Sequence, residues 1–285
     1  MALQITAIQP EHLPQVGEFL HCHLNRRFTP ERWIGSLVHP WSKDRPNHGM
    51  QLHDDEQLVG VFCAIYSDQL IDGRVERFCN PHSWCVLDSH RRHGIGLLLQ
   101  LIKQPGFHFT MFTPNPTVTA VFRGLKFKDL DAGQRVALNV PSLTTLQRDA
   151  FAESHPENLA NRLSGQALAD YLAHCDIPWL RFAAFGQGAE CCLAIYKPTR
   201  WKRLPCAWIM HVSDADVFLR HQGLLRHHLL LQHGFASLRI ESRWLPRAPW
   251  LSIAQTRLQP KLFLSKTLGQ AQIRDAYSEL MALDV

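Results

Sequence analysis

The chain has 285 residues, of which 46% are hydrophobic and 19% charged, and its formal net charge is +5 with histidine neutral. This composition excludes a disordered or low-complexity protein, and no apolar run approaches the ~18 residues of a membrane-spanning helix. The length predicts two domains. The N-terminus lacks a basic region followed by an apolar one, so we expect a cytoplasmic protein with reduced cysteines.

The first half of the chain alternates between extended and helical patterns. We expect strands at residues 3–8, 50–53, 57–66, 74–87, 107–112 and 135–140, and helices at 10–25, 30–38, 94–103 and 117–125. The acidic turn at 54–56 predicts a hairpin. The Asn80-Pro81 pair is expected to break the long extended stretch.

The second half repeats this order of elements. We expect helices at residues 157–175, 222–233 and 269–283, and strands at 179–185, 190–196, 205–212, 235–241 and 261–266. The parallel predicts two copies of one structural unit, although few residues are shared. We therefore expect an N-terminal domain of residues 1–141 and a C-terminal domain of residues 156–285, with the boundary in the polar stretch between Pro141 and Pro156.

A short basic loop, VLDSHRRHGIG at residues 86–96, joins a predicted strand to an apolar helix. Gly94 and Gly96 would let the backbone approach a ligand, and the amides of the first helical turn would point at it. Arg91 and Arg92, with His93, add positive charge. This pattern predicts a phosphate or pyrophosphate site. The alternative is an ordinary turn whose glycines only relieve crowding.

Arg91-x-x-Gly94-x-Gly96 resembles the acyl-CoA signature of the GCN5-related N-acetyltransferases (GNATs), and residues 115–127 resemble that family's strand–Asn–helix–Gly-Phe block. The resemblance covers residues 84–127. It implies an α+β fold, often filed as α/β, of two GNAT-like domains, the second degenerate, each a mixed and mostly antiparallel sheet flanked by helices. It also implies transfer of an acetyl or other acyl group from acyl-CoA to an amine by direct attack on the thioester.

The resemblance further implies the residues that hold acyl-CoA. The strand ending at Val86 would pair with the pantetheine arm, and a backbone N–H there would polarise the thioester carbonyl. Asn115 would touch the pantetheine. The pyrophosphate would be held by Arg91, Arg92, His93, Gly94, Ile95 and Gly96.

Three residues depart from the family pattern. Phe122 stands where many members have a Tyr that protonates the leaving thiolate, Lys126 replaces the Gly of the Gly-Phe pair, and Asp88 stands where Pro is common. These changes leave acyl-CoA binding intact and put the acid step in doubt. The alternative function is therefore a catalytically silent acyl-CoA-binding regulatory protein.

A general base must accept a proton from the ammonium form of the acceptor. Glu76 and His82 precede the basic loop on its strand, where the family often places its base, and we predict them as the catalytic residues. By composition alone, Glu76 can equally be a solvated strand charge. His82 can equally be a turn residue after Pro81.

Other motifs are weaker. Cys79, His82 and Cys85 have metal-like spacing, but positions 79 and 82 of a strand face opposite ways, so we expect no metal. Arg220-x-x-Gly223 stands where the repeat predicts a second phosphate loop, and Leu225 would crowd a ligand there. We expect this loop to be degenerate.

A late basic stretch carries two Trp residues among its cations, namely Arg239, Arg243, Trp244, Arg247, Trp250, Arg257, Lys261 and Lys266. Such a stretch can bind a nucleic acid, an anionic acceptor, or only solvent at a sheet edge. The modest net charge favours the solvated edge. We therefore expect neither a nucleic acid nor a membrane as partner, and a small-molecule or protein amine as acceptor.

Overall fold

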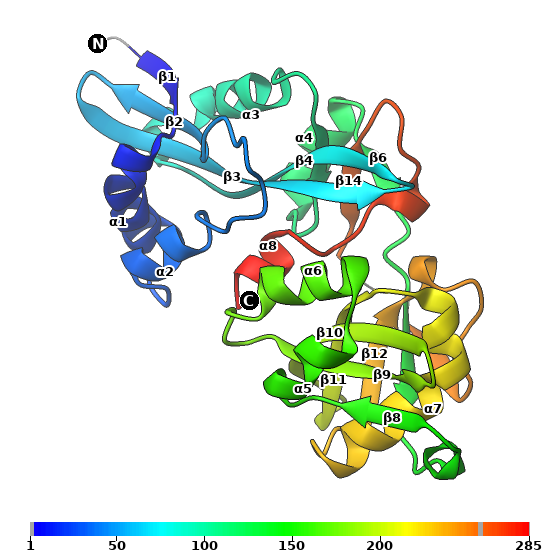
Figure 1. The fold of residues 1–285 in the computed structure, drawn as a ribbon. Helices are drawn as coiled ribbons and strands as arrows, with labels where there is room; N and C mark the ends of the chain where they lie inside the picture. The colour runs from blue at the N-terminus through cyan, green and yellow to red at the C-terminus, as the bar shows by residue number, and fades with distance from the viewer. Residues whose placement is uncertain (1–2, 256–258, 285) are drawn as a thin grey trace. The chain divides into compact units, whose positions relative to one another are not determined.

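A computed structural model describes residues 3–255 and 259–284 (Figure 1). The described residues form two seven-stranded sheets, each in its own compact unit. Unit 1 comprises Met1–Leu130, Pro260–Ile273 and Tyr277–Val285, and unit 2 comprises Asp131–Gln259 and Arg274–Ala276. The expected α+β class, with mixed and mostly antiparallel sheets flanked by helices, is confirmed.

Unit 1 holds the N-terminal elements together with two from the C-terminal end. Its strands are β1 (Leu3–Ala7), β2 (Gly49–Asp54), β3 (Gln57–Ile71), β4 (Arg74–Val86), β5 (His108–Met111), β6 (Lys128–Leu130) and β14 (Lys261–Leu264). Its helices are α1 (Leu13–His23), α2 (Pro30–Gly35), α3 (Gly94–Ile102), α4 (Pro116–Gly124) and α8 (Glu279–Ala282). Three 3-10 helices accompany them, η1 (Pro10–His12), η2 (Asp88–His93) and η5 (Gln270–Gln272).

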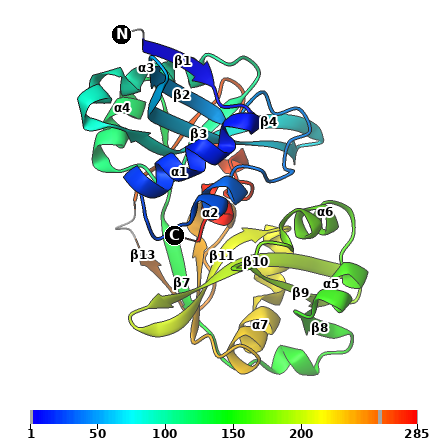
Figure 2. The ribbon, with the colours of Figure 1, turned by 90° about the vertical axis from the view of Figure 1, so that its left-hand side faces the viewer.

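The first sheet runs in the order β1-β2-β3-β4-β5-β14-β6, and only the β4–β5 pair is parallel. Helices α3 and α4 lie on one face of the sheet, and α1 and α2 lie on the other (Figures 1 and 2). The apolar side chains of each pair of helices pack into a separate core. Residues of β3 alternate between the two cores, as Leu58 and Val59 do. This alternation is what period-two patterning predicts for a strand buried on both faces.

β4 pairs with β5 at only two residues, Phe78 and Cys79. Opposite Pro81, Ala64 of β3 donates its N–H to His48 O at 3.0 Å, on the side away from β4. Ala64 and Pro81 are therefore a non-hydrogen-bonded pair of the antiparallel β3–β4 ladder, and the backbone of Pro81 faces β5 instead. Because proline has no N–H to donate, the β4–β5 ladder ends there.

Unit 2 repeats the pattern. Its strands are β7 (Gln134–Leu138), β8 (Ala150–Glu153), β9 (Arg181–Gln187), β10 (Glu190–Trp201), β11 (Leu204–Val212), β12 (Ser237–Glu241) and β13 (Ser252–Gln255). Its helices are α5 (Pro156–Arg162), α6 (Gly165–His174), α7 (Ala215–Leu231) and the 3-10 helices η3 (Leu143–Leu146) and η4 (Ser242–Trp244). The sheet order is β13-β7-β12-β11-β10-β9-β8, with β11 and β12 parallel. No helix among the described residues is both long and apolar enough to cross a membrane.

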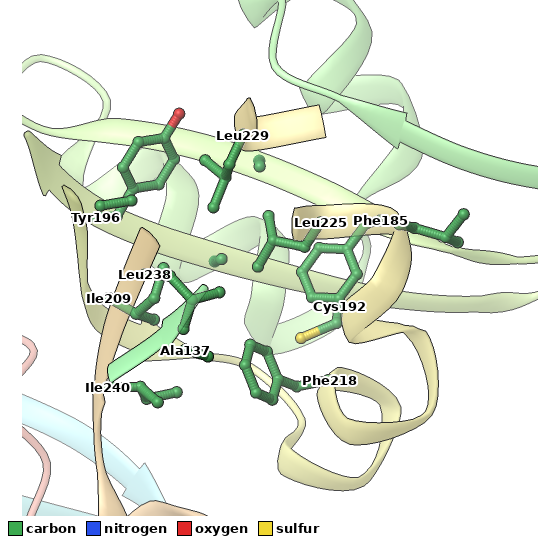
Figure 3. Packing of buried hydrophobic residues seen from close by; sticks show 14 of the residues in the cluster. Ala137, Phe185, Cys192, Tyr196, Ile209, Phe218, Leu225, Leu229, Leu238 and Ile240 are labelled. Carbon is green, nitrogen blue, oxygen red and sulfur yellow. The ribbon is translucent and has the colours of Figure 1, made fainter. Parts of the chain in front are cut away.

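One strand of each sheet comes from the other half of the chain. β14 lies between β5 and β6 in the first sheet, and β7 lies between β12 and β13 in the second. Ala137 of β7 belongs to the core of unit 2, beside Leu238 and Ile240 of β12 (Figure 3). The expected division into residues 1–141 and 156–285 therefore differs from these units, because strands 134–138 and 261–264 are exchanged.

Three helix predictions need correction. The predicted helix 269–283 is wrong: only η5 and α8 form, because Tyr277 has a φ of +63° and Ser278 caps α8 by accepting a hydrogen bond from Leu280 N–H. The predicted helix 157–175 is two helices, since Leu163 and Ser164 are extended. The predicted helix 222–233 starts earlier, at Ala215.

Candidate active site

One edge of β4 has no strand beside it beyond Cys79, within the part of the chain that the structure describes. Leu87, just past the strand, donates its N–H to Val59 O of β3 at 2.9 Å. Backbone groups alternate along a strand, so Val86 and Trp84 direct theirs to the opposite side, towards the edge that β5 has left. An extended ligand can pair with these groups as an added strand does.

A bulge in β4 lies within this open edge. Cys63 opposes His82 and Phe62 opposes Trp84, which leaves Ser83 without a residue opposite it on β3. Ser83 has a φ of +54°, in the left-handed region that residues other than glycine rarely adopt. Bulges redirect the strand and the side chains around them. The strained residue therefore lies where β4 diverges from its partner.

The open edge leads into the basic loop, which forms η2 and then α3. Arg91 and Arg92 are exposed; Arg91 pairs with Asp88, and Arg92 Nε donates to His93 Nε2 at 2.9 Å. Their charges are accessible to an anion at the surface. The N–H of Gly94 donates to Arg91 O. This one amide of the predicted phosphate site is therefore already bonded within the loop.

The two glycines of the motif have a packing role. A Cβ on Gly94 would lie 3.2 Å from Val86 Cγ2 and 3.4 Å from Trp84 Nε1, and one on Gly96 would lie 2.7 Å from Ile5 Cδ1. The plainer interpretation, that these glycines relieve crowding, is therefore part of the explanation. The same close packing brings the first turn of α3 against the side chains of Trp84 and Val86, the residues of the open edge of β4.

The structure places the two predicted bases at different points of β4. Glu76 lies beside the paired part of the strand, with its Oε2 2.9 Å from His108 Nε2. His82 is 3% exposed and its Nδ1 lies 2.9 Å from Ser83 Oγ. Burial, with a contribution from the positive charge of His39, lowers the pKa of His82 to about 3. A neutral imidazole of such low basicity is a poor proton acceptor at neutral pH.

Asn115 and Phe122, which the resemblance to GNATs singled out, both contribute to the fold. Asn115 caps α4, its Oδ1 accepting the N–H of Val118 at 2.9 Å. Phe122, at the family's usual Tyr position, is fully buried and packs against Phe127 with ring centroids 4.6 Å apart. Ile95 is 39% exposed on the first turn of α3. The contact between Asn115 and pantetheine therefore stays a prediction.

Sequence reasoning missed Glu279, which α8 carries into the space between β4 and β5. Its Oε1 accepts hydrogen bonds from Phe112 N at 3.2 Å and Thr113 Oγ1 at 3.1 Å, and its own N–H donates to Asn80 Oδ1 at 2.8 Å. Asn80 in turn donates to Thr110 of β5. Glu279 is 2% exposed, and its Oε2 has no hydrogen-bond partner among the described residues.

Burial raises the pKa of Glu279 to about 7, against the hydrogen bonds of Thr113 Oγ1 and the Phe112 N–H to Oε1, which favour the carboxylate. A carboxyl with this pKa exchanges a proton readily near neutral pH. No local motif marks this residue in the sequence. A carboxylate in an isolated sequence is by default assigned to the surface.

The cysteines near the site do not gather into a metal cage. Cys79 packs in the core under α3 and α4, whereas Cys85 packs in the core under α1 and α2, so the two thiols lie on opposite faces of the sheet. Among the described residues, no group of three or more His, Cys, Asp or Glu is arranged to hold a metal ion.

The predicted second phosphate loop is wrong as a loop. Arg220 and Gly223 lie inside α7, a continuous helix of 17 residues. The helix starts at Asp214, whose carboxylate accepts the N–H of Val217 at 2.8 Å. A carboxylate at that position repels an anion from the start of α7. Arg220 instead pairs with Glu190 at 2.7 Å.

The late basic stretch does not form one surface. Arg243 is 3% exposed and pairs with Glu241 at 2.6 Å and Asp275 at 2.7 Å, and Arg239 lies over the ring of Trp208. Lys261 lies in β14 of unit 1. Arg257 is outside the described residues. The cations that looked continuous in the sequence are divided between two units and partly neutralised.

No family model and no curated protein matches this sequence. Solved structures do match its fold. A GCN5-related N-acetyltransferase from Anabaena variabilis has a TM-score of 0.60 and 10% identity, and the match covers 92% of this chain and 72% of that one. Another from Kribbella flavida has a TM-score of 0.60 and 13% identity, covering 92% and 70%. The chain has the GNAT fold.

Eis1 from Mycobacterium abscessus matches with a TM-score of 0.50 and 12% identity, covering 92% of this chain and 73% of its own. The expected likeness to GNATs is thus confirmed over most of the chain rather than over residues 84–127 alone. The two sheets of the structure are consistent with a tandem arrangement of GNAT domains.

Proposed function

We propose that this chain is an acyl-CoA-dependent N-acyltransferase, with acyl-CoA bound to unit 1 and a small-molecule or protein amine as acceptor. One observation carries the proposal: the open edge of β4 leads directly into a basic loop at the start of a helix. A strand edge suits an extended arm with amides, and a helix start with arginines suits a pyrophosphate.

The residues fit the two ends of acyl-CoA. The backbone groups of Trp84 and Val86 would pair with the pantetheine arm. Arg91 and Arg92 would hold the pyrophosphate, with Arg91 exchanging Asp88 for the ligand. The thioester end would then reach the bulge at Ser83, where a backbone N–H can polarise the carbonyl. Bound acyl-CoA supplies the activated acyl group, and the protein supplies orientation and a proton acceptor.

Calorimetry with CoA tests the binding site. Arg91→Ala and Arg92→Ala should each weaken CoA binding about tenfold, because a hydrogen bond to a charged group contributes about 1.5 kcal/mol or more. The matched control is Arg220→Ala in α7, an arginine from the corresponding Arg-x-x-Gly motif of unit 2 that pairs with Glu190. We expect one CoA per chain and no change in the control. Equal losses in all three variants would refute the assignment of the site to unit 1.

The alternative is a catalytically silent acyl-CoA-binding regulatory protein, favoured by Phe122, which is buried and has no proton to give. Release of free thiol from acetyl-CoA in the presence of a panel of amines separates the two functions. Thiol release that depends on the amine supports transfer. CoA binding without thiol release from any amine supports the regulatory protein.

A further inference from the structure

The C-terminal segment contributes a carboxyl group to the space between β4 and β5. Glu279 reaches β4 through Asn80 and the end of β5 through Phe112 and Thr113. These contacts fix the backbone and one carboxyl oxygen. The other oxygen, Oε2, is buried without a partner, although a buried polar atom normally has one. An unpaired oxygen held by such a rigid frame indicates a partner that arrives with a ligand.

We propose that Glu279 accepts the proton of the acceptor amine, at the point where the open edge of β4 begins. This inference rests on the proposed N-acyltransferase function, since it places a proton acceptor where the thioester end would lie. Asn80 and His82 lie two residues apart on β4, on either side of Pro81, where the β4–β5 ladder ends. Glu279 is bonded to the first of them.

The ammonium form of the acceptor gives up one proton to Glu279 Oε2, and the lone pair that this frees forms the new C–N bond at the acyl carbon. The C–S bond breaks, and its electron pair leaves with the CoA sulfur as thiolate. The nitrogen then carries one proton more than the amide, and the thiolate takes up that proton. Glu279 releases its own proton to water, so that an amide, CoA and one proton in solution result and the carboxylate is restored.

The other titratable groups nearby compete poorly for this role. His82 is held neutral by its burial, which lowers its pKa to about 3. Glu76 is committed to His108 beside the paired end of β4. On β14, the ammonium of Lys261 lies 5.2 Å from the ring of Phe112. Burial holds the pKa of Glu279 at about 7, which suits a general base that works at neutral pH.

The test compares two amines as probes: propylamine, which is protonated at neutral pH, and hydroxylamine, which is mostly unprotonated there. Thiol release from acetyl-CoA is measured for wild type, Glu279→Gln and Glu279→Asp from about pH 6 to about pH 9. The matched control is Asp284→Asn, which changes an exposed carboxyl of the same segment that pairs with Arg32. Circular dichroism checks that each variant is folded.

Glu279→Gln should lower kcat/KM for propylamine by about 10²–10⁴-fold and for hydroxylamine by less than tenfold, because only the first amine needs the base. With propylamine, the wild-type rate should rise to a plateau above about pH 7, which Glu279→Asp should retain, whereas the Glu279→Gln rate should keep rising to about pH 9 with the fraction of free amine. Asp284→Asn should match wild type. Equal losses with the two amines would show a purely structural role and overturn the proposal, as would unchanged rates.

A second measurement is independent of the acceptor. In protein labelled with ¹³C at the glutamate carboxyls, the signal that Glu279→Gln removes should shift when acetyl-CoA binds, because the acyl end arrives beside it. Binding without a shift overturns the proposal and leaves the proposed function standing. Failure of wild type to bind acetyl-CoA overturns the proposed function and this inference with it.

Discussion

The carboxyl of Glu279 couples the stability of the protein to pH. Its pKa is raised from 4.5 to about 7 by burial, so the folded chain holds this proton more tightly than the unfolded chain does. The stabilising contribution is complete below about pH 4.5 and is lost as pH rises through about 7. By linkage, the contribution of this proton to the free energy of unfolding falls by about 3 kcal/mol over this pH range.

Glu279→Gln should remove this dependence, since an amide does not titrate. Relative to wild type, the variant should gain about 3 kcal/mol in the free energy of unfolding between about pH 4 and about pH 8. Urea unfolding followed by tryptophan fluorescence measures the gain, with Asp284→Asn as the exposed control. Parallel pH curves for wild type and Glu279→Gln would show that the buried carboxyl does not retain its proton.

At the scale of single elements, α4 separates a structural role from a binding role. Asn115→Ala should destabilise the protein by about 1 kcal/mol, because it removes the side chain that caps the helix. Asn115→Asp retains a capping oxygen but loses the amide N–H that a pantetheine contact would use. Thermal unfolding and CoA calorimetry on both variants separate the roles. If Asn115→Asp binds CoA as wild type does, the predicted contact with pantetheine is wrong.

Local signals in the sequence predicted most of the helices and strands that carry the candidate site. The helix predicted at 94–103 is α3, Gly94–Ile102, because an apolar run after a Gly-containing turn determines its own position. The break predicted at Asn80-Pro81 does not interrupt β4, which is continuous over Arg74–Val86. Instead, Pro81 ends the pairing with β5. A sequence shows that proline lacks a donor, but not which neighbouring strand that donor would have faced.

At the scale of the whole molecule, local sequence patterns do not predict which sheet a strand joins. The strands expected at 135–140 and 261–266 do form, as β7 and β14, yet each joins the sheet formed mainly by the other half of the chain. Period-two patterning predicts that a segment is extended, not which strand it will pair with. The sequence did not single out Glu279 for the same reason, because its partners Asn80 and Phe112 precede it by 199 and 167 residues.

The exchange of strands predicts how the chain responds to cutting. A fragment of residues 1–141 would lack β14, leaving β5 and β6 with unpaired edges, and should aggregate or dimerise. Coexpression of fragments 1–155 and 156–285 should restore a soluble complex, since each carries the strand that the other needs. Size-exclusion chromatography measures both outcomes. A stable monomer of residues 1–141 would show that the exchanged strand is dispensable.

The same exchange of strands makes unit 1 depend on the part of the chain that follows unit 2. Unit 2 starts its helix α7 with an acidic cap, and its described residues offer no counterpart of the basic loop. Yet the chain that leaves unit 2 returns to insert β14 into the first sheet and to deliver Glu279 between β4 and β5. A truncation after Leu130 that discards unit 2 therefore also removes a strand and a buried carboxyl from unit 1, so the integrity of the first sheet depends on chain that is made after unit 2.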